Sequence, residues 1–211
     1  MSESVCSVLA PKLLGTYECE LGDWIERLVA EGFPMVLNIG AAEGYYSVGF
    51  AWRCPQTRIV AFEGEPTGRA LIAELAARNC VTDRIAIDGF GTPETLRSYL
   101  DNAVKPLLIV DIEGGELDLL DPAKLPVLQH CFLLVELHEA AQPVAEILRT
   151  RFTASHYIAK CWTRPRDLRD LTTPMRIAAW ILGRRRFLKA LNEQRPGPMR
   201  WFLCEPREAV A

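Results

Sequence analysis

Apolar and polar positions along this chain follow two different periods. Tyr17, Leu21, Ile25 and Leu28 recur at the spacing of one helix face, whereas Pro106–Asp111 is one of several short, continuous apolar runs. A continuous apolar run bounded by turn residues is typical of a strand that is buried on both faces of a parallel sheet. Because such runs alternate with helical segments, the pattern predicts an α/β fold.

Seven strands and the helices between them can be placed from this pattern. The expected strands are Met35–Ile39, Arg58–Glu63, Arg84–Asp88, Pro106–Asp111, Cys131–Leu137, Thr153–Lys160 and Met199–Cys204. The expected helices are an N-terminal one capped by Thr16 and then Glu43–Arg53, Pro66–Asn79, Pro93–Asn102, Gly115–Leu120, Ala141–Thr150 and Met175–Leu191. We therefore expect a mostly parallel seven-stranded sheet with helices on both faces, a helical insertion before the last strand, and antiparallel pairing as an option for that strand.

A length of 211 residues fits a single domain with a sizeable core. Within it we expect a helical lid over residues 1–33, a ligand-binding core over 34–160, a basic helical insertion over 161–197, and the last strand with its tail over 198–211.

The composition excludes several classes of protein. Apolar residues make up 49% and charged residues 24% of the chain, as in ordinary globular proteins. No apolar run reaches the roughly 18 residues of a membrane span, and the first ten residues lack the basic start of a secretory signal. The seven cysteines are scattered, without the C-x-x-C spacing of a zinc site. We expect a cytoplasmic protein with reduced thiols and no membrane partner.

The net charge of −3 is unevenly divided, because residues 1–159 carry −10 and residues 160–211 carry +7. The basic end either binds an anionic partner or complements the acidic body of the same chain. Its arginines lack the interleaved aromatic residues of single-strand binders, so nucleic acid is not expected as a partner. The apolar positions Ile177, Trp180 and Ile181 are candidates for a homodimer contact.

A turn of small residues, Gly40-Ala41-Ala42-Glu43-Gly44, follows the first expected strand. Gly40, Ala42 and Gly44 would let the backbone approach a ligand and leave N–H groups near a helix N-terminus. Glu63 closes the second strand, where a carboxylate can accept both hydroxyls of a ribose. The G-x-A-x-G spacing differs from the G-x-G-x-x-G of dinucleotide sites, and so favours S-adenosylmethionine (SAM) over NAD.

Polar residues end five of the expected strands, and the carboxyl ends of parallel strands meet at one rim, where ligands bind. The residues expected to bind the cofactor are Asn38, Gly40, Ala42, Gly44, Glu63, Asp88 and Asp111. Two of them have a structural alternative, because Asp88 would also serve as the cap of the helix that follows it, and Asp111 as a carboxylate that stabilises the Gly114-Gly115 turn.

Three segments of the chain resemble the FkbM-type class I SAM-dependent methyltransferases. They are Leu37–Ser47, Ala61–Pro66 and Ile109–Leu117, which carries D-x-E-G-x-E, and Leu134–His138 looks like that family's fifth strand. The resemblance covers about residues 35–140 and implies a Rossmann-like class I methyltransferase fold, SAM as cofactor, and O-methylation of a hydroxyl, often on a sugar or a natural product.

Two positions depart from the pattern of these enzymes. Asn38 stands where the wider class has an acid, so contact with the methionine amino group must be weaker or made elsewhere. Ala42 stands where the turn usually has a glycine, which narrows the space for the ligand.

Asp111, Glu113, Glu136 and His138 are the candidates for handling the proton of a methyl acceptor. Glu136 and His138 are two apart on a strand, so their side chains share a face, and a neutral imidazole suits a general base. In the alternative, His138 caps the next helix and Glu136 is ion-paired. The same four residues would suit a divalent cation such as magnesium, but carboxylates gather at the strand ends of any such fold, so no metal is assigned.

The sequence therefore predicts a SAM-dependent methyltransferase that acts on a hydroxyl of a small molecule or a sugar-containing substrate. One alternative is a methyltransferase that acts on a macromolecule through the basic C-terminal region. Another is a methyltransferase-like binding or scaffold protein without catalysis, which Asn38 and Ala42 would favour, and an NAD-dependent dehydrogenase is the fourth. The 164–195 insertion carries no recognisable code for the acceptor.

Overall fold

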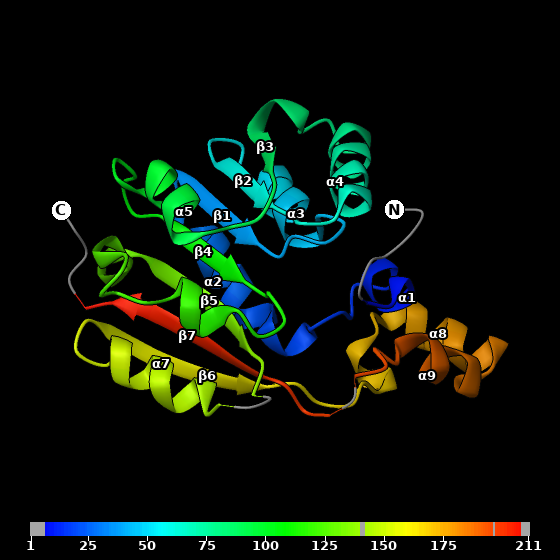
Figure 1. Ribbon diagram of the computed structural model, residues 1–211. Helices are drawn as coiled ribbons and strands as arrows, with labels where there is room; N and C mark the ends of the chain where they lie inside the picture. Colours follow the sequence, from blue (N-terminus) through cyan, green and yellow to red (C-terminus); the bar gives the residue numbers. More distant parts are fainter. Residues whose placement is uncertain (1–6, 140–141, 196, 208–211) are drawn as a thin grey trace.

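The computed structural model describes residues 7–139, 142–195 and 197–207, and its centre is a seven-stranded sheet (Figure 1). The strands are β1 (Met35–Ile39), β2 (Arg58–Phe62), β3 (Ile85–Asp88), β4 (Leu107–Val110), β5 (Phe132–Leu137), β6 (His156–Trp162) and β7 (Arg200–Pro206). Their order in the sheet is β3-β2-β1-β4-β5-β7-β6. Strands β1 to β5 pair in parallel, and β7 runs antiparallel to both β5 and β6. The predicted fold class, with its antiparallel last strand, is confirmed.

Both faces of the sheet are buried, which explains the continuous apolar runs of the central strands. Along β1, Leu37 and Ile39 pack into one core, whereas Val36 packs into the other. Strand β4 alternates in the same way, because Leu108 belongs to the first core and Ile109 to the second. Successive side chains of a strand point to opposite faces, so only a run without polar interruptions can fill both cores.

Helices cover the two faces in separate groups. Side chains of α2 (Gly22–Glu31), α3 (Tyr45–Arg53) and α4 (Pro66–Arg78) pack into the core that contains Val36. Side chains of α5 (Pro93–Leu100), α6 (Glu116–Leu119) and α7 (Val144–Phe152) pack into the opposite core. Within the described residues, no helix combines the length and the apolarity that crossing a membrane would require.

The N-terminal region differs from the prediction. The chain forms α1 (Leu9–Leu13), a 3₁₀ turn (Cys19–Leu21) and only then α2. Thr16 does not cap a helix, because its hydroxyl donates to the carbonyl of Pro11. Glu18 adopts a left-handed conformation with φ of 48° before the 3₁₀ turn, which breaks the expected single helix.

The expected helix Met175–Leu191 is two helices, α8 (Thr173–Leu182) and α9 (Arg184–Leu191), because Gly183 has φ of +113° and ends the first. They lie beside α1, beyond one end of the sheet (Figure 1). Leu14 packs with them against a small separate core of Leu171, Ala179 and Leu191. The apolar residues Ile177, Trp180 and Ile181 of α8 are exposed, so the homodimer contact expected there stays a prediction.

The other helices match the prediction with shifted ends. The α7 helix begins at Val144 and ends at Phe152, and the expected start at Ala141 lies outside the described residues.

Candidate active site

A cavity of about 600 Å³ lies where β1, β2 and β4 end at the rim of the sheet. Its walls come from four loops that each follow a parallel strand. Its lining residues include Gly40, Ala42, Glu63, Gly64, Phe90, Asp111 and Glu113. The predicted meeting of strand ends at one rim is therefore present as a cavity of the size typical for a small-molecule ligand.

The turn after β1 brings the backbones of two strands unusually close. Gly40 has φ of +78°, and a Cβ at this position would lie 1.7 Å from the carbonyl oxygen of Asp111, so only glycine fits. Ala42 is also left-handed, with φ of 49°. Gly44, the N-cap of α3, has its Cα packed towards Ile72 of α4 and lies outside the cavity, where it serves helix packing.

Glu63 lies at the edge of the cavity with its carboxylate held by backbone donors. The N–H of Ala42 donates to Oε2 at 2.6 Å, and the N–H of Glu65 donates to Oε1 at 2.8 Å. Each carboxylate oxygen has two acceptor sites, so one on each oxygen is left for a ligand hydroxyl. Gly68 makes room for this side chain, because a Cβ on Gly68 would lie 2.7 Å from Glu63 Cγ.

Phe90 adds an aromatic wall to the cavity. Its side chain is 77% exposed although it is large and apolar. The ring lies against Gly64, where an added Cβ would be 2.6 Å from the ring. Such a ring, open on its other side, can stack on a flat ligand ring.

Besides Gly44, two more of the predicted cofactor residues, Asn38 and Asp88, do not line the cavity. Asn38 is only 2% exposed, and its side-chain oxygen accepts a hydrogen bond from Ser47 in α3 at 2.9 Å. As the neighbour of Leu37 and Ile39 on β1, it faces the opposite core and not the cavity. Asp88 accepts hydrogen bonds from the N–H of Gly89 and from the hydroxyl of Tyr99. The structure thus favours a structural role for both side chains.

Asp111 and Glu113, which line the cavity, form a group with Glu116 and His138 behind them, here called the His138 cluster. His138 Nδ1 lies 2.6 Å from Glu116 Oε1, and Glu116 is fully buried. His138 Nε2 lies 3.6 Å from Asp111 Oδ1 and 3.5 Å from Glu113 Oε2. It also lies 3.8 Å from Glu136 Oε2, so Glu136 and His138 do share a face of β5 and its extension, as expected.

The surroundings shift the proton affinities of this cluster. Burial raises the pKa of Asp111 well above its usual range, and the negative charges of Glu136 and Glu18 raise it further. Burial by itself would lower the pKa of His138, but the hydrogen bond with Glu116 and the nearby carboxylates leave it raised. Burial is thus the main cause for Asp111, and the neighbouring carboxylates are the cause for His138.

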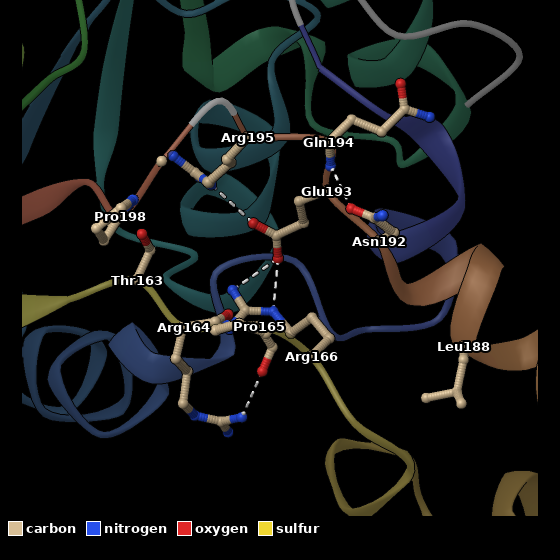
Figure 2. A pocket seen from close by; sticks show the side chains of 11 residues that line it. Thr163, Arg164, Pro165, Arg166, Leu188, Asn192, Glu193, Gln194, Arg195 and Pro198 are labelled. Carbon is tan, nitrogen blue, oxygen red and sulfur yellow. Dashed lines mark hydrogen bonds and ion pairs between the residues drawn. The ribbon is translucent and has the colours of Figure 1, made fainter.

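A second acidic group, here called the paired cluster, lies next to the first. It consists of Glu18, Glu20, Glu136, Glu193, Arg166 and Arg195. Arg195 donates to Glu136 Oε1 at 2.5 Å, to Glu193 Oε2 at 2.9 Å and to Glu18. Figure 2 shows Glu193 between Arg195 and Arg166, on the wall of a separate cavity of about 580 Å³ in the insertion. Glu136 is therefore ion-paired, as the alternative interpretation required.

The N-terminal region is attached to the glycine turn and to the paired cluster. Lys12 of α1 forms a buried ion pair with Glu43, within the turn. The ring of Tyr17 packs edge to face on Tyr45, and the hydroxyl of Tyr46 donates to Glu18. These tyrosines belong to the packing of the molecule.

Sequence reasoning missed four residues of the site: Gly68, Phe90, Glu116 and Arg195. The D-x-E-G-x-E segment contained a signal for Glu116, because its last acid is five residues after Asp111 on the short helix α6. Phe90 lies on the loop after β3, where a single aromatic residue forms no pattern that would mark it. Arg195 could not be found, since it is 59 residues from its partner Glu136.

No protein-family model matches the chain, and no curated protein matches it in sequence. Solved structures do share its fold. The O-methyltransferase TomG from Streptomyces achromogenes, involved in tomaymycin synthesis and in complex with SAM, has a TM-score of 0.56 at 14% identity, over 90% of this chain and 80% of that chain.

Two further solved structures have nearly the same similarity. An O-methyltransferase from Bacillus cereus in complex with SAH has a TM-score of 0.52 at 12% identity, over 87% of this chain and 80% of that chain. The precorrin-6y C5,15-methyltransferase from Geobacter metallireducens has a TM-score of 0.52 at 12% identity, over 86% of this chain and 87% of that chain. At such identities the likeness shows the fold, which is the Rossmann-like fold of class I methyltransferases.

Proposed function

We propose that this protein is a SAM-dependent methyltransferase that methylates a hydroxyl group of a small-molecule or sugar-containing acceptor. The observation that carries the proposal is one cavity that joins the Gly40 turn, the carboxylate of Glu63 and the exposed ring of Phe90 to an acid–imidazole cluster. The fold, which this chain shares with O-methyltransferases that were crystallised with SAM or SAH, supports the same assignment.

The residues of the cavity fit the parts of an adenosyl ligand. Glu63 retains an acceptor site on each oxygen for the two ribose hydroxyls. Phe90 offers the face of its ring to the adenine. Asp111 places a carboxylate at the end nearest the Gly40 turn, where the positively charged methionyl part would lie. Asn38 is hydrogen-bonded inside the core, so the methionine amino group must find its partner elsewhere.

Bound SAM would supply an electrophilic methyl group, which an in-line attack by the acceptor oxygen displaces. The protein's own task is to position the acceptor and to receive its proton. We assign the second role to Asp111, Glu113, Glu136 and His138, because each of the three carboxylates has an oxygen within 3.8 Å of His138 Nε2.

The resemblance to FkbM-type enzymes in residues 35–140 supports a sugar or natural-product hydroxyl as the acceptor. We also propose the cytoplasm as the location. The support is that the six described cysteines are free thiols, a state typical of a reducing compartment.

The experiment is calorimetric titration of the purified protein with SAM, together with the variants Glu63→Gln and Phe90→Ala. We expect both variants to bind SAM about tenfold more weakly or worse, because a lost stacking or hydroxyl contact costs about 1–3 kcal/mol. Glu74→Gln, on the exposed side of α4, and Trp52→Ala, another exposed aromatic, are the matched controls and should bind as the wild type does.

A transfer assay with methyl-labelled SAM and a panel of hydroxyl acceptors completes the test. Label should pass to an acceptor with the wild type and not with His138→Gln. The proposal fails if the wild type binds no SAM, or if it binds SAM equally well after Glu63→Gln and Phe90→Ala. Binding that is intact but without transfer to any acceptor would favour the scaffold alternative.

A further inference from the structure

We propose that the His138 cluster binds one divalent transition-metal cation, with His138 Nε2, Asp111 and Glu113 as the protein ligands. These three residues offer one nitrogen and two carboxylate oxygens that all lie within 4.8 Å of one another. The binding of the cation is independent of the proposed function. Its action on the acceptor hydroxyl rests on the proposed function.

The spacing of the three ligand atoms suits a common centre. His138 Nε2 is 3.6 Å from Asp111 Oδ1 and 3.5 Å from Glu113 Oε2. Two ligand atoms that bind a cation at about 2.1 Å in tetrahedral geometry lie about 3.4 Å apart. These separations are too long for direct hydrogen bonds and match the spacing of two ligands on one cation.

Glu116 holds the imidazole in the orientation of a metal ligand. Its fully buried carboxylate lies 2.6 Å from Nδ1. When Nδ1 carries the proton, it donates to Glu116, and the lone pair of Nε2 then points towards Asp111 and Glu113. A carboxylate behind a histidine is the usual arrangement around metal-binding histidines, because it fixes the tautomer and raises the basicity of the ligand nitrogen. Glu116 is thus a positioning residue.

Unpaired negative charge gives an independent argument. Oδ1 of Asp111 is a buried atom that has no hydrogen-bond partner among the described residues. In that same part of the chain, His138 is the one cationic side chain within ion-pair distance of Asp111, Glu113 or Glu116. Buried charges need a counterion or a metal, and one imidazole cannot balance three carboxylates.

The ligand set and its position indicate which cation binds and what it does. One imidazole with two carboxylates favours manganese, iron or zinc over magnesium and calcium, which prefer oxygen alone. Asp111 and Glu113 also line the cofactor cavity. A cation there would bind the oxygen of the acceptor hydroxyl and lower its pKa, which favours loss of the proton before transfer.

The test is titration of the chelator-treated, full-length protein with Mn²⁺, followed by the loss of the electron paramagnetic resonance signal of free Mn²⁺. We expect one tight site in the wild type and an affinity lowered about tenfold or more by Asp111→Asn and by Glu113→Gln. Glu139→Gln removes the same charge from the residue next to His138 and should leave the affinity unchanged. Glu113 is 73% exposed, so its variant keeps the fold even if Asp111→Asn does not.

Each result decides the proposal. It is overturned if the wild type binds no Mn²⁺, if both ligand variants bind Mn²⁺ as tightly as the wild type, or if Mg²⁺ displaces Mn²⁺ at equal concentration. SAM titration of the same metal-free protein separates this proposal from the proposed function. A protein that binds SAM but does not bind Mn²⁺ refutes only the metal site. A protein that binds Mn²⁺ but does not bind SAM refutes only the methyltransferase assignment.

Discussion

The His138 cluster and the paired cluster are neighbours, yet their negative charges are balanced in opposite ways. In the paired cluster, Arg195 contacts Glu18, Glu136 and Glu193, and Arg166 contacts Glu193 and Glu20. In the His138 cluster, the carboxylates of Asp111, Glu113 and Glu116 share a single imidazole, within the part of the chain that the structure describes.

This difference separates charge that holds the fold together from charge that is available for a ligand. The paired cluster joins the N-terminal Glu18 to β5 and to the segment before β7 through Arg195, so its charges are used within the protein. The His138 cluster has two carboxylates on the wall of the cavity, those of Asp111 and Glu113, and no arginine or lysine pairs with them in the described part of the chain. Acidic residues at strand ends are thus informative only when their counterions are known.

Removal of Arg195 should have the largest effect on this comparison. Arg195→Ala leaves Glu18 and Glu136 buried without their cation, and breaking a buried pair in this way costs about 3–5 kcal/mol. Urea unfolding should show that loss of stability. Arg164→Ala is the control, because the Arg164 side chain is 48% exposed and a pair that water reaches in this way contributes at most about 1 kcal/mol. Equal losses in the two variants would show that the paired cluster is not structural.

The pH dependence of stability should reveal the charge of Glu18. Burial raises the pKa of Glu18 to about 7, with the charges of Glu136 and Glu193 adding to the shift. Its contribution is complete below the ordinary pKa of about 4.5 and is lost as the pH rises through 7, so stability falls by up to about 3 kcal/mol over that window. Glu18→Gln should make the fall of unfolding free energy smaller, and the part that remains belongs to Asp111 and His138, whose pKa values are also raised.

The control for this profile is Glu26→Gln, since Glu26 is exposed and its pKa is lowered by Arg53. It should retain the fall of stability between pH 5 and about 7. If the fall is as large in Glu18→Gln as in the wild type, Glu18 does not contribute to it.

The smallest expected effect is in the His138 cluster, where Glu116→Gln should weaken Mn²⁺ binding about 10- to 100-fold, the usual effect of losing a carboxylate behind a metal-binding histidine. Thermal unfolding of the metal-free variant should be nearly unchanged, because glutamine has the same shape and keeps an acceptor for the N–H of Gly114. Glu193→Gln, in the paired cluster, should leave Mn²⁺ binding as in the wild type. If Glu193→Gln weakens Mn²⁺ binding and Glu116→Gln does not, the metal site lies in the paired cluster and not in the His138 cluster.

Most of the fold could be predicted from local pattern. The strands near Val36, Ile59 and Leu108 were found because both faces of each are buried and their apolar runs are continuous. The N-terminal helix was predicted wrongly because Glu18 has a left-handed backbone conformation. The side chain of Glu18 is held by Arg195, which is far away along the chain. Sequence pattern contains no signal for such a distant restraint.

The candidate site was predictable only in part, for a related reason. The sequence predicted that Gly40, Glu63 and Asp111 lie at one rim, because the carboxyl ends of parallel strands lie at the same edge of the sheet. It also placed Asn38 there, but the alternation of side chains along β1 turns Asn38 towards Ser47. Residue type and position in a strand indicate which residues lie near the rim. The alternation of side chains along the strand decides which of them face the cavity.

The sequence by itself determined the α/β fold, the glycine turn and the group of acids at the strand ends, because these depend on local periodicity and on backbone freedom. Only the tertiary structure decided which of those acids are neutralised. Arg195 reaches Glu136 across 59 residues, and no arginine reaches Asp111 within the described residues. Charge balance is a property of distances in space, and those distances exist only once the chain has folded.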